Sequence, residues 1–173
     1  MNTRHMKATG LMILLSLGLS ACAPVMLAGF AGTAMVASDR RTSGAQLEDE
    51  TIELRGSARV RDNLGEKAHV NVTSYNRQVL LTGEVPTERD KQLVVSLVEK
   101  VENVKTVVNE LAVMQPTTLS SRSNDLVITG KIKASLVDSR DLFSNAFKVV
   151  TERNTVYVMG RVTQREANSA TNV

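Results

Sequence analysis

The sequence has few of the residues that build active sites. Its one cysteine is Cys22, and its two histidines are His5 and His69. One cysteine allows no internal disulfide, and no cluster of His and Cys is present to hold zinc. No glycine-rich phosphate loop occurs, and His69, at the start of an alternating segment, is expected to be a surface residue. We therefore expect no enzymatic activity, no catalytic residue, no metal site and no cofactor.

The chain also lacks the features of a nucleic-acid-binding protein. Aromatic residues make up 3% of it and form no platform on which bases could stack. No run of five basic residues occurs, and the net charge of +3 falls when Arg4 and Lys7 leave with the leader described next. Nucleic acid is therefore excluded as a partner.

The N-terminus reads as a secretory signal. Arg4 and Lys7 precede an uncharged, leucine-rich stretch that ends in Leu19-Ser20-Ala21-Cys22. This tetrapeptide resembles the lipobox of bacterial lipoproteins, which implies cleavage before Cys22 and covalent diacylglyceryl and N-acyl lipid on that residue. Ala23, in place of the aspartate associated with inner-membrane retention, favours the outer membrane.

Two alternatives to lipidation stay open at this point. Cys22 could be an ordinary thiol that happens to follow a signal. Residues 8–38 carry no charge and are long enough to span a bilayer as an uncleaved anchor. Pro24 and the many small residues after it make a poor spanning helix, so cleavage is the favoured interpretation.

A repeat organises the rest of the chain. Val79–Val85 and Val156–Val162 share the pattern apolar-x-apolar-x-Gly-x-Val at an offset of 77 residues. Their two-residue alternation predicts strands, and the polar stretches Ser74–Gln78 and Glu152–Thr155 predict hairpin turns. We expect the repeated glycine to make room for a packed helix.

Helices are expected on either side of each hairpin. Asp49–Leu64 predicts a first helix, which Gly56 weakens, and Pro86–Asp90 opens a second that leads to a strand over Val104–Val113. Asp125 is the expected N-cap of a third helix. The expected inward-facing positions are Ile52 and Val60 in the first helix, Leu93, Leu97, Val98 and Val101 in the second, and Ile128, Ile132 and Leu136 in the third.

The fold class is therefore α+β, with two tandem αββαβ units. This unit, with its V-x-L-x-G-x-V strand, resembles the BON domain, and two of them behind a lipobox resemble the dual-BON outer-membrane lipoproteins. Asp39–Gln46 is similar to the junction between the lipidated tail and the first domain in that family. Asn124–Asp125, before Ile128–Thr129, is similar to the start of its second domain. The expected boundaries are a signal peptide at 1–21, a lipidated tail at 22–45, a first domain at 46–114, a linker at 115–123 and a second domain at 124–173.

One departure from this family pattern stands out. The offset of 77 would place the end of the second unit well beyond Val173, so it lacks the end of its last helix and its final strand. The helix expected from Gln164 turns polar along its length. Either the gene is truncated or frameshifted, or a partner completes the fold.

The resemblance implies a periplasm-facing outer-membrane protein that supports envelope integrity and binds anionic phospholipid through its second domain. The distribution of charge agrees with binding of an anionic lipid by the second domain. Residues 46–114 carry 9 basic and 12 acidic residues, whereas residues 115–173 carry 8 basic and 5 acidic residues. The lipid-binding candidates are Leu126, Val127, Lys131 and Lys133. Two alternatives stay open: an ordinary solvated helix, and a protein–protein adaptor for outer-membrane assembly proteins that docks through strand edges or helices.

Overall fold

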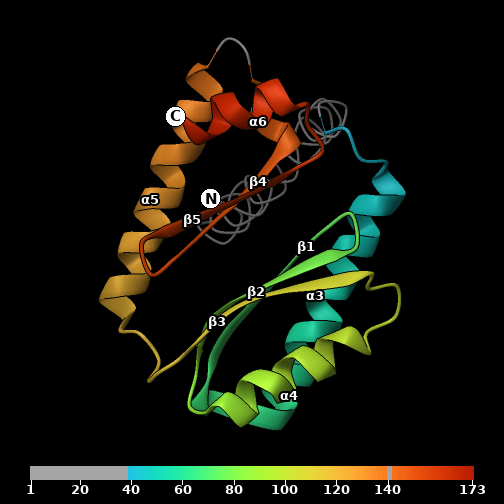
Figure 1. The fold of residues 1–173 in the computed structure, drawn as a ribbon, viewed down its shortest axis with the longest axis vertical. Coiled ribbons are helices and arrows are strands. Elements are labelled where there is room, and N and C mark those ends of the chain that lie inside the picture. The colour runs from blue at the N-terminus through green and yellow to red at the C-terminus, as the bar shows by residue number, and fades with distance from the viewer. Residues whose placement is uncertain (1–38, 140–141) are drawn as a thin grey trace, which may run out of the picture. The chain divides into compact units, whose positions relative to one another are not determined.

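The computed structural model describes residues 39–139 and 142–173 (Figure 1). Cys22 and the signal sequence lie outside the described residues. Within those residues, no helix combines the length and the apolar character that crossing a bilayer requires. Ser38–Val173 forms one compact unit, within which the two repeats are recognisable as a first and a second subdomain.

The first subdomain is an αββαβ unit, as the sequence predicts. Its β1 and β2 pair antiparallel, and β2 and β3 pair parallel because α4 crosses between them. Helices α3 and α4 pack together and against the strands (Figure 1). The bounds are Ser43–Leu64 for α3, His69–Tyr75 for β1, Gln78–Val85 for β2, Glu88–Glu99 for α4 and Thr106–Val113 for β3.

The first subdomain differs from the expected one in the start of α3 and in the buried positions of α4. Helix α3 begins at Ser43 rather than Asp49, because the Thr42 hydroxyl caps it. In α4 the buried positions are Val94 and Val98, whereas Leu93 and Leu97 are half-buried. The other buried apolar members of this core are Ile52, Val60, Val72, Val79, Leu81, Val85, Val101 and Leu111.

The second subdomain is an αββα unit with a two-stranded sheet in the described residues. Its buried apolar core is small and consists of Leu136, Leu142, Val149 and Ala170, with Ile132, Phe147 and Val156 packed against it. Ile128 is half-buried. The bounds are Leu119–Asp138 for α5, Phe147–Glu152 for β4, Thr155–Gly160 for β5 and Gln164–Thr171 for α6.

The start of α5 is not where the sequence placed it. The Thr118 side chain accepts a hydrogen bond from the Ser121 amide at 3.2 Å, so the helix begins six residues before Asp125. Asp125 is therefore not the N-cap. The stretch from Leu119 to Ser123, assigned to the linker by its polarity, is helical.

The repeated glycines have a different cause from the expected one. Gly83 has φ +111°, and a Cβ there would collide with the His69 carbonyl oxygen on the paired strand. At Gly160 a Cβ would lie 2.9 Å from the Ala146 carbonyl oxygen. Neighbouring backbone, rather than a packed helix, excludes a side chain at both positions. The glycine that faces a strand from a helix is Gly56, where a Cβ would lie 3.0 Å from Val72.

A buried aspartate holds the hairpin turn in each repeat. Asn76–Arg77 and Arg153–Asn154 all have positive φ, between 49° and 69°, as a type I′ turn requires. Asp49 accepts both amides of the first turn at 2.7 and 2.8 Å. Asp125 accepts both amides of the second at 3.0 and 2.9 Å. Asp49 and Asp125, which the sequence placed at the starts of helices, thus accept the hydrogen bonds that hold each helix against its hairpin.

We predict that Asp49→Ala lowers the free energy of unfolding by about 3–5 kcal/mol, because the buried carboxylate loses its charge-assisted hydrogen bonds to Arg41, to Ser74 and to the two turn amides. Urea denaturation monitored by circular dichroism measures this. Asp62→Ala, at an exposed position of the same helix, is the matched control and should change little. Equal stability of the two variants would contradict the proposed role of Asp49.

The environment of the Asp49 carboxylate predicts that the protein loses stability in acid. Burial raises the pKa of Asp49, but hydrogen bonds from Arg77, Ser74, Asn76 and Arg41 outweigh it and hold the pKa below its ordinary value. A folded-state pKa below the unfolded one adds stability that is present above about pH 4 and is lost as the pH falls toward the folded-state value. The wild-type protein should therefore lose more stability than Asp49→Ala between neutral pH and pH 3. Parallel pH profiles would contradict this assignment.

Candidate lipid-binding site and the interface of the two subdomains

The four predicted lipid-binding residues all lie on α5 and are exposed. They form two rows rather than one patch. Val127 and Lys131 are one helical turn apart, whereas Leu126 and Lys133 are two turns apart on a neighbouring stripe. The structure therefore brings Leu126 together with Lys133, and Val127 together with Lys131.

The row through Leu126 is longer than the sequence indicated. Leu119, Leu126 and Val137 recur at spacings of 7 and 11 residues, which places them on one side of the helix. Their exposed fractions are 78%, 72% and 67%. Leu119 lies before Asp125, where the sequence indicates that the helix starts, and Val137 lies directly after Leu136, the last position expected to face inward. The full bounds of α5 are needed to see that both continue the row through Leu126.

The charges of α5 favour an anionic partner. Its two carboxylates are Asp125, which is buried against the β4–β5 turn, and Asp138 at its last position. The exposed face before Asp138 therefore carries Lys131 and Lys133 with no acidic side chain. Apolar side chains beside lysines suit the interface of an anionic bilayer.

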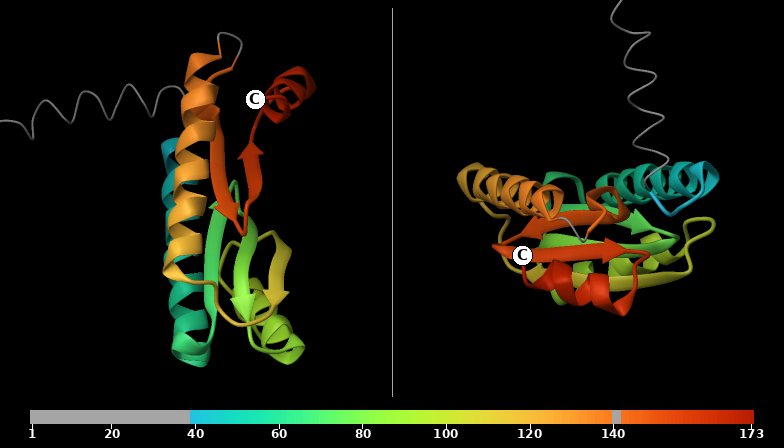
Figure 2. Two further views of the ribbon diagram at one scale, coloured as in Figure 1. Left: turned by 90° about the vertical axis from the view of Figure 1, so that its left-hand side faces the viewer. Right: turned by 90° about the horizontal axis from the view of Figure 1, so that it is seen from above.

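A cavity of about 420 Å³ adjoins this row. Leu126 and Lys133 lie on its wall, and their neighbours come from both subdomains. Figure 2 shows α3 and α5, which contribute to opposite sides of it, in one layer beside the strands. The other lining residues are Ser57, Val70, Asn71, Val72, Thr73, Thr129, Val149, Val150 and Thr151. The volume falls in the range of small-ligand sites, and polar and apolar side chains are mixed in the lining.

The segment that leads out of the expected lipidated tail is fixed by two arginines. Arg40 donates to both carboxylate oxygens of Glu166 on α6, at 2.9 and 2.6 Å, and this lowers the pKa of Glu166 to about 2. Arg41 donates to Asp49 at 2.8 Å and lies over the Tyr75 ring, 4.1 Å from its centroid. The start of α3 is therefore attached to both subdomains.

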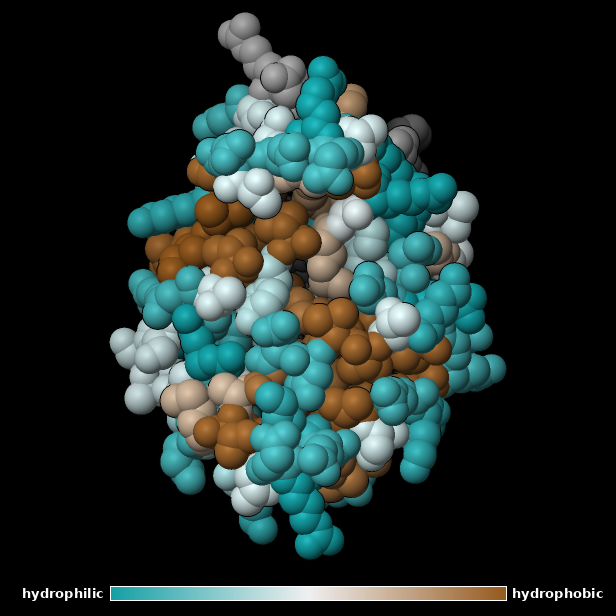
Figure 3. Space-filling view, viewed as in Figure 1, coloured by the Kyte–Doolittle hydropathy of each residue, from teal (hydrophilic) through white to brown (hydrophobic). Residues whose placement is uncertain are grey.

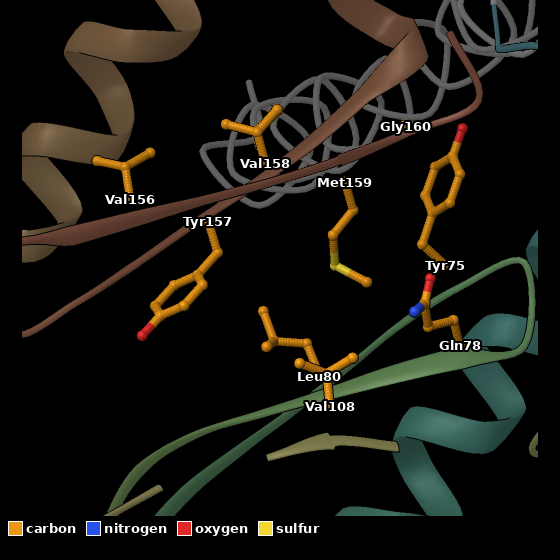
Figure 4. A pocket seen from close by; sticks show the side chains of 9 residues that line it. All are labelled: Tyr75, Gln78, Leu80, Val108, Val156, Tyr157, Val158, Met159 and Gly160. Atoms are coloured by element: carbon orange, nitrogen blue, oxygen red, sulfur yellow. The ribbon is translucent and has the colours of Figure 1, made fainter. Parts of the chain in front are cut away.

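The face of β5 that lies opposite the first sheet borders a second cavity, of about 470 Å³. Tyr157 and Met159 point toward Leu80 and Val108 of the first subdomain, while Val156 and Val158 point to the other side (Figure 4). Figure 3 shows apolar side chains gathered over this part of the molecule.

Hydrogen bonds cross the same interface at its two ends. The Tyr75 hydroxyl donates to the Ala146 carbonyl at 3.2 Å and accepts from the Arg161 amide at 3.0 Å. Arg153 donates to the Gly83 carbonyl at 2.7 Å. Lys148 pairs with Glu53.

His69 is not the surface residue that the sequence suggested. Its side chain is 21% exposed, and its Nδ1 lies 3.3 Å from Glu84 Oε2 and 4.0 Å from Glu152 Oε1. Glu84 is fully buried, and Glu152 is 2% exposed. Burial raises the pKa of Glu84, but hydrogen bonds from Thr117 and Arg153 outweigh it and hold the pKa below its ordinary value. Among the described residues these three form the group of side chains that could hold a metal.

Comparison with known proteins gives the family. The BON domain model matches residues 49–115 and 124–173. The outer membrane lipoprotein DolP of Haemophilus influenzae is 33% identical over 175 residues, which cover 100% of this chain and 91% of that protein. A 21 kDa hemolysin of Actinobacillus pleuropneumoniae is 31% identical over 137 residues, which cover 78% of this chain and 71% of that protein. The chain therefore belongs to the DolP family of outer-membrane lipoproteins, which are non-enzymatic proteins with two BON domains.

Proposed function

We propose that the protein faces the periplasm, is held in the outer membrane by lipid on Cys22, and binds anionic phospholipid through the second BON domain to support envelope integrity. The exposed row Leu119, Leu126 and Val137 on α5, flanked by lysines, carries this proposal. Leucine and valine side chains enter the headgroup region, and the lysines stay at the anionic surface.

The geometry extends the proposal beyond surface contact. The cavity beside Leu126 opens between the two subdomains, next to Lys133. Penetration of an acyl segment there would explain why a helix of a globular domain leaves large apolar side chains exposed at its margin. The lipid-binding residues are therefore Leu126, Val127, Lys131 and Lys133, with Leu119 and Val137 added.

The second candidate function is a protein–protein adaptor for outer-membrane assembly proteins. One observation favours it: β5 pairs with β4 along one side and has no partner strand along the other among residues 39–139 and 142–173. A free strand edge next to an apolar cavity is the geometry that strand addition uses. The two functions use different surfaces, so variants of α5 separate them.

We predict that a soluble form beginning at Ser38 binds anionic vesicles and that binding falls with added salt. Because each lysine near an anionic surface contributes about 1 kcal/mol, Lys131→Glu with Lys133→Glu should weaken binding at least about thirtyfold. Vesicle co-sedimentation measures this. Leu126→Ser with Val137→Ser should weaken binding without changing its salt dependence.

The matched control for the lysine experiment is Lys100→Glu with Lys105→Glu, an identical charge change at exposed positions of the first subdomain. The control should bind nearly as well as wild type. If both double variants lose binding equally, net charge rather than α5 is responsible. If the α5 variant binds normally, the adaptor function is the better one.

For the anchor, we predict that Cys22→Ala abolishes incorporation of a clickable fatty acid and leaves unprocessed precursor. One acyl chain gives only marginal membrane binding, so stable attachment needs several chains on this residue. Ala23→Ser, which leaves the thiol intact, is the control and should be labelled. Labelling of Cys22→Ala at the wild-type level would contradict lipidation at Cys22. Recovery of the wild-type protein in the inner-membrane fraction would contradict sorting to the outer membrane, but not lipidation.

A further inference from the structure

We propose that His69, Glu84 and Glu152 form a divalent transition-metal site that joins the two BON domains, with Zn²⁺ as the ion to test. The ligand atoms lie within 4.8 Å of one another and come from three strands of two sheets. The ligands of this site lie on β1, β2 and β4 and are not among the proposed lipid-binding residues of α5, although Leu126 lines the cavity that leads to them.

Glu152 supplies the strongest reason to expect a cation. Its side chain is 2% exposed, and its Oε2 accepts a hydrogen bond from Asn71 at 2.7 Å. In the described part of the chain, no donor lies within hydrogen-bond distance of the other oxygen, whose nearest cationic candidate is His69 Nδ1 at 4.0 Å. Glu152 lines a cavity, so an ion that reaches Oε1 from there would place a positive charge beside this carboxyl group.

Glu84 is already held in the orientation that a ligand needs. Its Oε2 accepts from the Thr117 amide at 3.0 Å and from the Thr117 hydroxyl at 3.1 Å. Arg153 donates to its Oε1 at 3.3 Å. Ligating carboxylates are oriented by such outer hydrogen bonds.

Two of the three pairs of groups have a spacing close to that of zinc ligands, and all three ligand atoms lie within 4.8 Å of one another. With bonds of about 2.0–2.2 Å, neighbouring ligands of a tetrahedral zinc ion lie about 3.3–3.6 Å apart. The His69–Glu84 separation of 3.3 Å already meets this value, and the His69–Glu152 separation of 4.0 Å requires a shift of a few tenths of an ångström. One imidazole with two carboxylates favours zinc or a similar metal over magnesium and calcium, which prefer all-oxygen sites.

A route to the site exists. A cavity of about 230 Å³ is lined by His69 and Glu152 together with residues of α5, among them Arg122 and Leu126. The cavity gives an ion access and leaves space for a water molecule as a fourth ligand. Because Glu152 belongs to the second domain and the other two ligands to the first, a bound ion would link the domains.

The test is Zn²⁺ titration of the full mature lipoprotein in detergent micelles, carrying no polyhistidine tag, by isothermal calorimetry and thermal unfolding. We expect one ion per chain and a higher unfolding midpoint with Zn²⁺, with Mg²⁺ and Ca²⁺ having no effect. His69→Gln and Glu152→Gln should each weaken binding more than about tenfold. Glu102→Gln, an exposed carboxylate distant from the cluster, should bind as wild type does.

A second measurement needs no variant. The imidazole ¹⁵N resonances of His69, the one histidine left after cleavage before Cys22, should shift on Zn²⁺ addition at constant pH. Absence of Zn²⁺ binding, a histidine signal that responds to pH but not to Zn²⁺, or undiminished binding by His69→Gln would each overturn the site. None of these outcomes changes the result expected in the vesicle experiment. The metal site and the lipid-binding function can therefore be disproved independently of each other.

Discussion

The main constraint on this structure is the small core of the second domain, whose two-stranded sheet faces the sheet of the first domain. Four buried apolar residues form its core, against ten in the first domain. Two strands under one long helix are marginal by themselves, because much of the hairpin stays in contact with water. The first domain supplies part of the cover: Leu80 and Tyr75 are buried on the side of its sheet that faces β5, and a cavity of about 470 Å³ remains between the sheets.

Polar bonds fix this packing in one register. Tyr75 joins the start and the end of the second hairpin through Ala146 and Arg161, and Arg153 reaches the Gly83 carbonyl at the other end. Arg153 also lies in the turn whose backbone amides donate to Asp125. The position of α5, and with it the exposed row through Leu126, is therefore set through the hairpin by the sheet of the first domain.

The sequence predicted the repeated hairpins, the crossover helix, the third strand of the first domain and the start of α6, because each has strong local alternation or a cap. It missed the first turns of α3 and α5, since Thr42 and Thr118 begin helices whose early residues are polar and lack periodicity. Asp49 and Asp125 looked like helix-start residues because an acidic residue before an apolar stripe is the usual cap pattern. Their bonds to turns 27 to 29 residues away have no local signal.

The candidate site shows the same limit. Leu126, Val127, Lys131 and Lys133 could be found because charge and apolar spacing are local properties, whereas Leu119 lies before the expected start of the helix. The His69 cluster could not be found, because Glu152 reaches the cross-strand pair His69–Glu84 only when the second sheet lies beside the first. A search for zinc ligands by His and Cys spacing detects neither a carboxylate-rich set nor one that spans two domains.

The most direct measurement is the amide NMR spectrum of residues 116–173 expressed alone, compared with the same residues in the protein from Ser38 to Val173. If the second domain depends on the sheet of the first, the isolated segment gives the narrow proton dispersion of an unfolded chain, and the dispersion returns when the first domain is attached. A well-dispersed spectrum of the isolated segment, with the chemical shifts of the longer protein, would show that the second domain folds by itself and would contradict the central role of the interface.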